Sequence, residues 1–308
     1  MNRKSKIYIA GHNGMVGSAI YRKLKLKGFE NILVKSSKEL DLRNQKSVND
    51  FFKKNKPEYV FLAAAKVGGI YANIKYKADF IYDNLMIESN VINSSYKYQI
   101  KKLLFLGSSC CYPKNSPQPI KENYLLRGYL ESTIKSYAIA KIAGIELCMS
   151  YREQHGCDFI SVLPTNLYGF NDNYHPENSH VIPSLIRKTI IAKKNNQSFI
   201  SVWGSGYSKR DFLHVDDLAD ACIFLMNKSK KYDLINVGSG SDISINNLIK
   251  KIFSIANFNG KIKYDLNKPE GPIKKLLDTT LVNDLGWNPK INLDLGLKKV
   301  IKNVSNNF

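Results

Sequence analysis

The sequence of 308 residues predicts an α/β fold, in which a Rossmann-like, doubly wound parallel sheet is joined to a smaller α/β substrate domain. Three observations support this prediction. A strand pattern near the N-terminus runs into a glycine-rich turn and then a helix. Apolar strand patterns go on alternating with helical patterns up to residue 170. Beyond that point the alternation loosens, so we assign 1–170 mainly to the nucleotide-binding domain and 171–308 mainly to the substrate domain, with chain crossings between them allowed.

The first unit is a strand over residues 6–10, the turn "GHNGMVG" and a helix that reaches residue 28. Its glycines form a GxxGxxG motif. In a dinucleotide-binding turn, Gly11 would permit the tight turn, Gly14 would let a pyrophosphate approach, and Gly17 would let helix and strand pack closely. The helix N-terminus also favours an anion. The motif therefore predicts a dinucleotide site.

A second strand covers residues 31–35 and indicates which dinucleotide binds. An acidic residue after this strand would bind the ribose 2′-hydroxyl of NAD, whereas a basic one suits the 2′-phosphate of NADP. Lys35 and Lys38, with two serines between them, precede the first acidic residue. This favours NADP(H). The alternative is an exposed polar loop without a cofactor role.

The next elements continue the pattern. We expect a strand from residue 59 that runs into a loop ending at residue 69, a helix over 78–98, a strand over 101–107 and a helix over 136–151. The strand at 101–107 is apolar throughout, as a parallel strand buried on both faces should be. In the second half we expect helices over 184–194 and 245–257 and a strand over 199–204.

The stretch "SSCCYP" begins where the 101–107 strand ends. Ligands of doubly wound sheets bind at the carboxyl ends of the strands, so this stretch is predicted to face a ligand. Side chains alternate along an extended segment. We therefore expect Cys110 to lie on the same side as Ser108, and Cys111 to point into the protein as a small hydrophobic residue.

Tyr137 and Lys141 lie four residues apart, on one face of a helix. An ammonium near a phenol lowers the pKa of the phenol. The phenol can then donate a proton to a carbonyl oxygen while a hydride reaches the carbonyl carbon. The spacing is common in helices, but together with the glycine turn and Ser108 it predicts a reductase.

Bulk properties limit the other classes of function. The five cysteines form an odd set without CxxC spacing, which argues against disulfides or a zinc site, and we expect no metal. There is no signal-peptide pattern and no apolar run of about 18 residues, so we expect a cytoplasmic protein without a membrane span. The net charge of +20 comes from scattered lysines, which predicts solvated helix faces and not a nucleic-acid partner. An anionic substrate would still be attracted by the positive field.

Several blocks carry a family resemblance, among them "AGHNGMVGSAI", "LLFLGSSC", "YAIAKIAGIELC", "PTNLYG" and "RDFLHVDDLA". From about residue 5 to 300 the chain resembles the GDP-L-fucose synthase family of extended short-chain dehydrogenases/reductases. The resemblance implies NADPH-dependent reduction of the C4 ketone of a GDP-linked 4-keto-6-deoxy sugar, with C3/C5 epimerisation. It also implies a homodimer formed through helices 78–98 and 136–154.

The resemblance implies roles for individual residues. Ser108 and Tyr137 would hold the C4 oxygen, Lys141 would bind the nicotinamide ribose, and Cys110 and His180 would act as base and acid. The implied cofactor set is Gly11, Asn13, Gly14, Met15, Val16, Gly17, Lys35, Lys38, Asp41, Leu42, Ala64, Lys141, Pro164, Asn166, Leu167 and His180. The implied substrate set is Ser108, Cys110, Tyr137, Asn166, Lys188, Trp203, Arg210, Glu270 and Lys275.

The sequence departs from the family pattern at three places. Asn13 stands where the family has an arginine that helps to bind NADP. "ESTIKSYAIAK" lacks the family's prolines, and "YGFNDNY" replaces "YGPHDNF". The last two changes border the sugar site and leave the sugar open. One alternative is a GDP-4-keto-heptose C4-reductase of capsule sugar biosynthesis with little or no epimerase activity. The others are a sugar-nucleotide epimerase or dehydratase that recycles bound NAD, and a non-catalytic protein that senses the cofactor.

Overall fold

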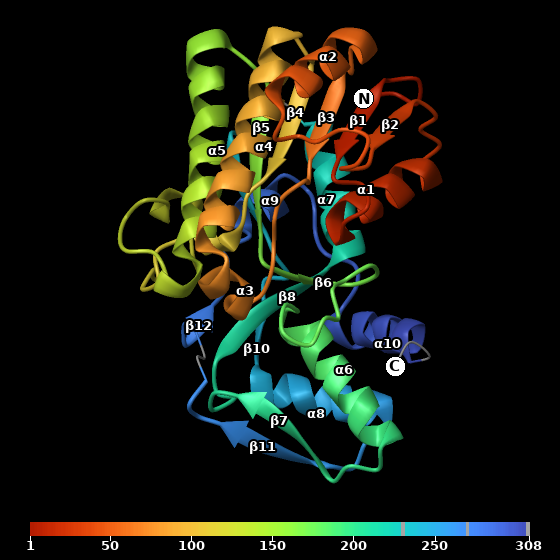
Figure 1. Ribbon diagram of the computed structural model, residues 1–308, viewed down its shortest axis with the longest axis vertical. Helices are drawn as coiled ribbons and strands as arrows, with labels where there is room; N and C mark the ends of the chain where they lie inside the picture. The colour runs from red at the N-terminus through yellow and green to blue at the C-terminus, as the bar shows by residue number, and fades with distance from the viewer. Residues whose placement is uncertain (229–231, 269–270, 306–308) are drawn as a thin grey trace.

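A six-stranded parallel sheet forms the upper part of the computed structural model, which describes residues 1–228, 232–268 and 271–305 (Figure 1). The strand order is β2-β1-β3-β4-β5-β9, and each neighbouring pair is parallel. The strands are β1 (Ile7–Ala10), β2 (Ile32–Lys35), β3 (Tyr59–Leu62), β4 (Lys102–Leu106), β5 (Phe159–Pro164) and β9 (Leu234–Val237). This is the predicted doubly wound sheet.

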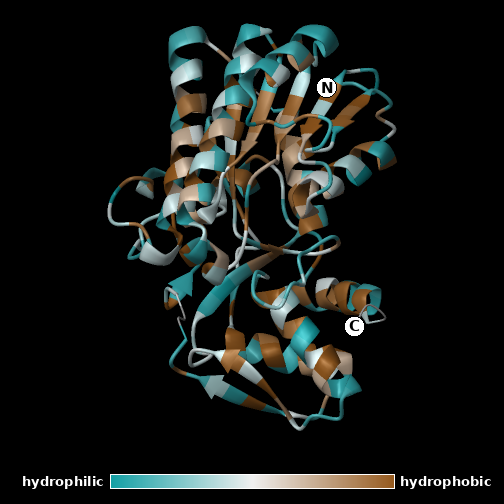
Figure 2. Cartoon of the chain, in the orientation of Figure 1, coloured by the Kyte–Doolittle hydropathy of each residue, from teal (hydrophilic) through white to brown (hydrophobic). Residues whose placement is uncertain are grey.

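Helices cover both faces of this sheet. On one face α1 (Met15–Leu26) packs against α7 (Val215–Met226); on the other, α2 (Gln45–Asn55) and α5 (Lys135–His155) flank α4 (Lys77–Lys97). Figure 2 shows the strands mainly in the hydrophobic colours and much of the outer helix surface in the hydrophilic ones. Burial on both faces explains why these strands are almost continuously apolar.

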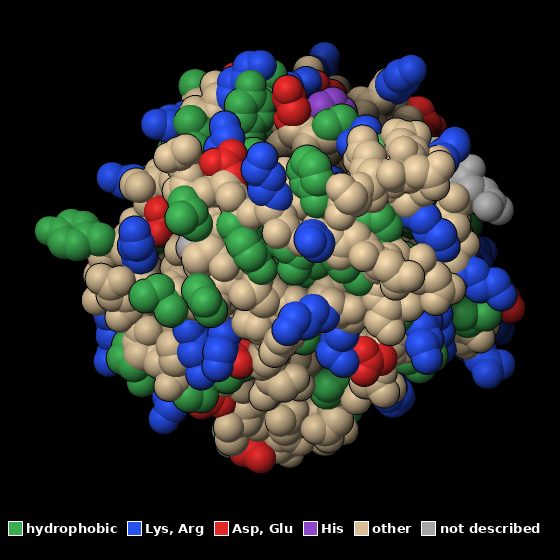
Figure 3. Space-filling model, turned by 90° about the horizontal axis from the view of Figure 1, so that it is seen from below, with side chains coloured by type: hydrophobic (Ala, Val, Ile, Leu, Met, Phe, Trp, Pro, Cys, Tyr) green, Lys and Arg blue, Asp and Glu red, His purple; other side chains and the backbone are tan. Residues whose placement is uncertain are grey.

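The lower part contains smaller sheets and three packed helices (Figure 1). Strand β8 (Lys209–His214) pairs with β6 (Asn166–Tyr168), β10 (Asp242–Ser244) and β12 (Lys274–Lys275), while β7 (Phe199–Trp203) pairs with β11 (Lys261–Asp265). The helices α6 (Val181–Lys194), α8 (Ile245–Ala256) and α10 (Leu293–Val304) share one apolar core. Figure 3 shows this end from below, with lysine and arginine side chains dispersed over it.

The chain passes between the two parts more than once. It leaves the large sheet after β5, builds β6 to β8 in the lower part, and returns with α7 and β9. It then enters the lower part again. The short helices α3 (Ile70–Lys75) and α9 (Thr280–Asp284) contact the upper part, α9 through β9.

The predicted elements lie within a few residues of the observed ones. The first helix starts at Met15, the helix predicted at 184–194 starts at Val181, and the helix carrying Tyr137 runs on to His155. Sequence patterns had not assigned α2, β5, α7, β9 or α10. No helix within the described ranges has both the length and the apolar composition to cross a membrane.

Candidate active site

A cavity of about 810 Å³ lies where the carboxyl ends of β1, β3, β4 and β5 meet the lower part of the chain. This is the edge at which doubly wound sheets bind ligands, and the volume is typical of a small-molecule site. Residues from both parts line the cavity, which therefore brings together groups that are far apart in the sequence.

The glycine turn forms one end of the cavity, and its shape depends on absent side chains. Gly11 has φ +90°, and a Cβ there would lie 2.6 Å from the backbone nitrogen of Ala64. A Cβ on Gly17 would lie 2.1 Å from the Gly11 carbonyl oxygen. Gly14 is the N-cap of α1, so the positive end of that helix faces the cavity. The turn thus fits the pyrophosphate of a dinucleotide.

The two lysines after β2 line the cavity but differ in their partners. Lys35 forms an ion pair with Glu39 at 2.9 Å, whereas Lys38 is exposed at the cavity edge. Arg43, which the sequence reasoning missed, also lines the cavity and pairs with Asp41 at 2.9 Å and Asp83 at 3.1 Å. The Asp41–Arg43 contact lowers the pKa of Asp41. Lys38 is therefore the better-placed cation for a phosphate.

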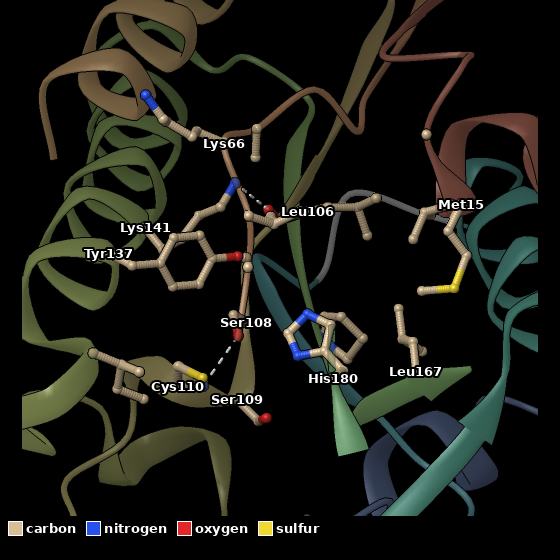
Figure 4. Close-up of a pocket in the computed structure, with 18 of the residues that line it drawn as sticks. Met15, Lys66, Leu106, Ser108, Ser109, Cys110, Tyr137, Lys141, Leu167 and His180 are labelled. Carbon is tan, nitrogen blue, oxygen red and sulfur yellow. Dashed lines mark hydrogen bonds between the residues drawn. The ribbon is translucent and has the colours of Figure 1, made fainter. Parts of the chain in front are cut away.

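Lys141 is buried beside the end of β4. Its Nζ donates a 2.9 Å hydrogen bond to the Leu106 carbonyl, lies 3.0 Å from a carboxylate oxygen of Glu88, and sits 4.6 Å from the centre of the Phe105 ring. Figure 4 shows its ammonium directed at the Leu106 carbonyl, above the Tyr137 ring. Glu88 was not singled out from the sequence.

Tyr137 lines the cavity, but its ionisation differs from the prediction. Burial raises the pKa of Tyr137 well above its usual value, and negative charge at Cys110, Cys111 and Glu88 acts in the same direction, while a hydrogen bond with Ser108 opposes it. The expected net lowering of this pKa is wrong for this structure, because burial outweighs any effect of Lys141, whose ammonium is also paired with Glu88.

The two adjacent cysteines lie in different surroundings. Cys110 lines the cavity, whereas Cys111 is completely buried and burial raises its pKa to about 12. The alternation argument was wrong, since a 3-10 turn over Ser109–Cys111 follows Ser108 directly. The Cys110 amide donates to the Ser108 hydroxyl at 3.1 Å, which fixes this turn (Figure 4). The side assigned to each cysteine is nevertheless as predicted.

Two basic residues reach this region from the lower part. Lys275 of β12 donates to the Cys110 sulfur at 3.5 Å. Lys275 is paired in register with Arg210 of β8, and both residues line the cavity. The family resemblance placed Lys275 in the nucleotide-sugar site, and the structure places it beside the thiol.

His180 and Asn166 also line the cavity. His180 precedes α6, and Figure 4 shows its ring across the pocket from Ser108 and Cys110. Desolvation lowers the pKa of His180 and therefore favours its neutral imidazole. The side-chain amide of Asn166 donates a 3.0 Å hydrogen bond to the backbone carbonyl of Asp211.

Some predicted site residues do not line the cavity. Lys188 donates to the Ser201 carbonyl at 2.9 Å, and Trp203 is half-exposed near Lys268. Gly17 lies beneath the glycine turn, and Glu270 is outside the described residues. The remaining predicted residues do line it: Asn13, Met15, Val16, Asp41, Leu42, Ala64, Pro164 and Leu167.

Further cavity residues had not been singled out from the sequence. Lys66 follows β3 and pairs with Asp83 at 2.9 Å, and its position after a parallel strand is a signal that could have found it. Glu131 and Thr133, just before α5, also line the cavity: Glu131 pairs with Lys114 at 3.2 Å, and the buried Thr133 hydroxyl lacks a hydrogen-bond partner among the described residues. No cluster of three or more His, Cys, Asp or Glu able to hold a metal occurs in the described ranges.

Comparisons with known proteins agree with this geometry. Residues 7–238 match the model of the NAD dependent epimerase/dehydratase family. The chain is 53% identical to "GDP-L-fucose synthase 1" of Arabidopsis thaliana, covering 99% of this chain and 96% of that protein. It is 49% identical to "GDP-L-fucose synthase" of Escherichia coli (strain K12), covering 96% and 94%. A solved GDP-mannoheptose C4 reductase from Campylobacter jejuni with NADP bound is 40% identical, with a TM-score of 0.91 and 98% of each chain covered.

Proposed function

The chain belongs to the NAD dependent epimerase/dehydratase family, and we propose that it is an NADPH-dependent reductase of a GDP-linked 4-keto-6-deoxy sugar that also inverts C3 and C5. One observation carries this proposal. One cavity contains the reductase set Ser108, Tyr137 and Lys141. Cys110 lies next to Ser108, and His180 lies on the opposite wall. The relatives named GDP-L-fucose synthase support the choice of substrate.

The residues at the glycine end would hold the cofactor. The turn and the N-terminus of α1 suit a pyrophosphate, Lys38 suits the 2′-phosphate, and Lys141 can reach a ribose hydroxyl. When bound there, NADPH supplies the hydride. The NADP bound to the solved heptose reductase supports this choice of cofactor.

Ser108 and Tyr137 would act on the ketone oxygen. The raised pKa of Tyr137 keeps its phenol protonated at neutral pH. The phenol can therefore donate a proton as negative charge develops on the oxygen at C4, and the Ser108 hydroxyl can donate a hydrogen bond to the same atom. Tyr137 then regains a proton from solvent.

Cys110 and His180 would carry out the epimerisation. C3 and C5 flank the ketone, so each can lose its proton to give an enolate. Lys275 donates a hydrogen bond to the sulfur of Cys110, which would take the proton from one face. His180, across the cavity, is placed to return a proton to the other face from its protonated form, which it reaches by taking up a proton from solvent. Cys110 releases the abstracted proton to solvent, so each cycle restores the C–H bond with inverted configuration and leaves both groups in their starting states.

The remaining assignments concern the nucleotide and the assembly. Arg210 lines the cavity and suits a diphosphate, while Lys188 and Trp203 would extend the site along β7. A homodimer through the outer faces of α4 and α5 and a cytoplasmic location remain predictions. The exposed Tyr82 and Ile139 on these two helices support the dimer interface.

A second candidate is C4 reduction of a GDP-4-keto-heptose without epimerisation. The solved GDP-mannoheptose C4 reductase favours it, because that protein is 40% identical to this chain and its fold overlays 98% of it. Such an enzyme could keep Cys110 and His180 as contacts to the sugar.

One experiment separates the candidates. The purified protein is given NADPH in D₂O with GDP-4-keto-6-deoxymannose or, separately, with a GDP-4-keto-heptose. The proposal expects NADPH oxidation with the hexose and deuterium at C3 and C5 of the product. Faster heptose reduction without deuterium would support the second candidate. Turnover without NADPH oxidation, in protein that carries NAD, would indicate an NAD-recycling enzyme, and no turnover would indicate a binding protein.

A further inference from the structure

Glu88 on α4 faces Lys141 on α5 across the contact between the two helices. Their charged atoms lie 3.0 Å apart, and the side chains are 1% and 2% exposed. We propose that Glu88 is a positioning residue for the reduction, because it holds Lys141 in place and limits how much of the Lys141 charge reaches Tyr137. This inference rests on the proposed function.

The packing around Glu88 leaves space for its carboxylate. A Cβ on Gly144 of α5 would lie 2.8 Å from a Glu88 carboxylate oxygen and 2.5 Å from a ring carbon of Phe105. The same Phe105 ring lies under the Lys141 ammonium. Glycine at position 144 therefore lets the carboxylate and the aromatic ring reach Lys141 between two closely packed helices.

The Lys141 ammonium has two partners within the protein and one further N–H donor. An ammonium has three N–H donors. The Leu106 carbonyl takes one and Glu88 faces another, so the third is available on the cavity side. Removing either of these partners would let the Lys141 side chain rotate away from the cavity.

Glu88 itself depends on Lys141. The Glu88 carboxylate has no hydrogen-bond partner other than this ion-pair contact among the described residues. Burial raises the pKa of Glu88, and the neighbouring Lys141 opposes this rise because it stabilises the ionised carboxylate. Breaking such a pair leaves a buried charge uncompensated, which is strongly unfavourable. The two residues therefore form one unit within the helix contact.

The charge of Glu88 also acts on Tyr137, because negative charge there raises the pKa of the phenol. Replacing Glu88 with glutamine removes this effect and leaves Lys141 unneutralised, so Tyr137 should ionise at lower pH. Since the phenol must be protonated to donate to the ketone, the alkaline limb of the reduction profile should move to lower pH.

The test uses Glu88→Gln, Glu88→Asp and, as a matched control, Ser95→Ala, which alters another buried polar residue of α4 that bonds within its own helix. The ionisation of Tyr137 is followed by NMR of ¹³Cζ-labelled tyrosine in the substrate-free protein, with the signal assigned by its loss in Tyr137→Phe. The rate of ketone reduction is measured against pH in parallel.

Glu88→Gln is expected to lower the Tyr137 titration midpoint by about one pH unit and to move the alkaline limb in the same direction. Glu88→Asp, whose shorter side chain withdraws the carboxylate from Lys141, is expected to shift both in the same direction by a smaller amount. Ser95→Ala should leave both unchanged. A Tyr137 titration that is identical in Glu88→Gln and wild type would overturn the proposal. If Glu88→Gln does not fold, the proposal is overturned by a Glu88→Asp variant whose Tyr137 titration and NADPH affinity are both the same as in the wild type. A shifted titration in a protein that reduces no GDP-4-keto sugar would refute the proposed function and leave the role of Glu88 intact.

Discussion

The Nζ atom of Lys275 lies 3.5 Å from the sulfur of Cys110, although 165 residues separate them in the chain. The contact is fixed from both sides, because β12 pairs with β8 and the Leu276 amide donates to the Gln118 side chain at 2.7 Å. The C-terminal segment thus places an ammonium group in contact with the cavity-lining thiol.

The first prediction follows from this contact. Lys275→Gln should slow the alkylation of Cys110 by iodoacetamide near neutral pH by up to about tenfold, because it removes the ammonium that contacts the reacting sulfur. The rate is measured by mass spectrometry of the Cys110 peptide, which separates it from the partly exposed Cys157. Lys274→Gln is the matched control, since Lys274 pairs with Asp242 instead. Equal rates in the two variants would contradict the role given to Lys275.

The two cysteines should respond differently to replacement by alanine. Cys110→Ala is expected to lose deuterium incorporation at C3 and C5 by about 10²-fold or more, as loss of a general base does. Cys111→Ala should retain the incorporation and show a lower melting temperature, because it removes a completely buried side chain. Product NMR and a thermal melt measure both effects. The same loss of incorporation in both variants would be incompatible with this assignment.

The lysines after β2 should contribute unequally to cofactor choice. Lys38→Ala is expected to raise the KM for NADPH about tenfold and leave that for NADH nearly unchanged, as expected for a lost charge-assisted phosphate contact. Lys35→Ala should have a smaller effect, because Glu39 already pairs with Lys35. Steady-state kinetics with both cofactors test this. A larger effect in Lys35→Ala would reverse the assignment.

Asp172, in the loop that leads to His180, should make stability depend on pH. Burial raises the pKa of Asp172 from 3.8 to about 7. Between these values the unfolded chain has released the proton while the folded chain still binds it, so stability falls as pH rises through this interval. Asp172→Asn cannot ionise and should melt at increasingly higher temperature than wild type from about pH 4 to pH 7. A constant difference in melting temperature across this range would show that Asp172 does not titrate there.

Much of the fold could be predicted because periodicity and glycine placement are local signals. The strand–turn–helix unit at Gly11, the apolar strand before Ser108 and the Tyr137 helix all carry patterns that depend on neighbouring residues. The short strand β9 has no such signal, since it becomes a sheet strand through its partner β5. Pairing of that kind depends on the tertiary fold.

The site could be predicted in part for the same reason. The reductase set Ser108, Tyr137 and Lys141 and the cavity-lining Cys110 lie in recognisable local sequences. Glu88 and Lys275 instead act through contacts between segments far apart in the chain. The alternation rule does not hold after Ser108, because strand β4 ends at Leu106, two residues earlier, and a 3-10 turn begins at Ser109. Burial of Tyr137 likewise outweighed the lowering of its pKa that was expected from Lys141, and it depends on contacts that a local motif does not report.

The return of α7 and β9 to the large sheet limits how this enzyme could have been assembled by recombination. A gene fragment ending at residue 170 would leave β5 as an edge strand with unpaired backbone groups. It would also expose Ile20 and Leu24 of α1, which share an apolar cluster with α7. Residues 1–170 are therefore not a module that can be exchanged by a single crossover, because β9 and α7 complete the large sheet and the cluster around α1.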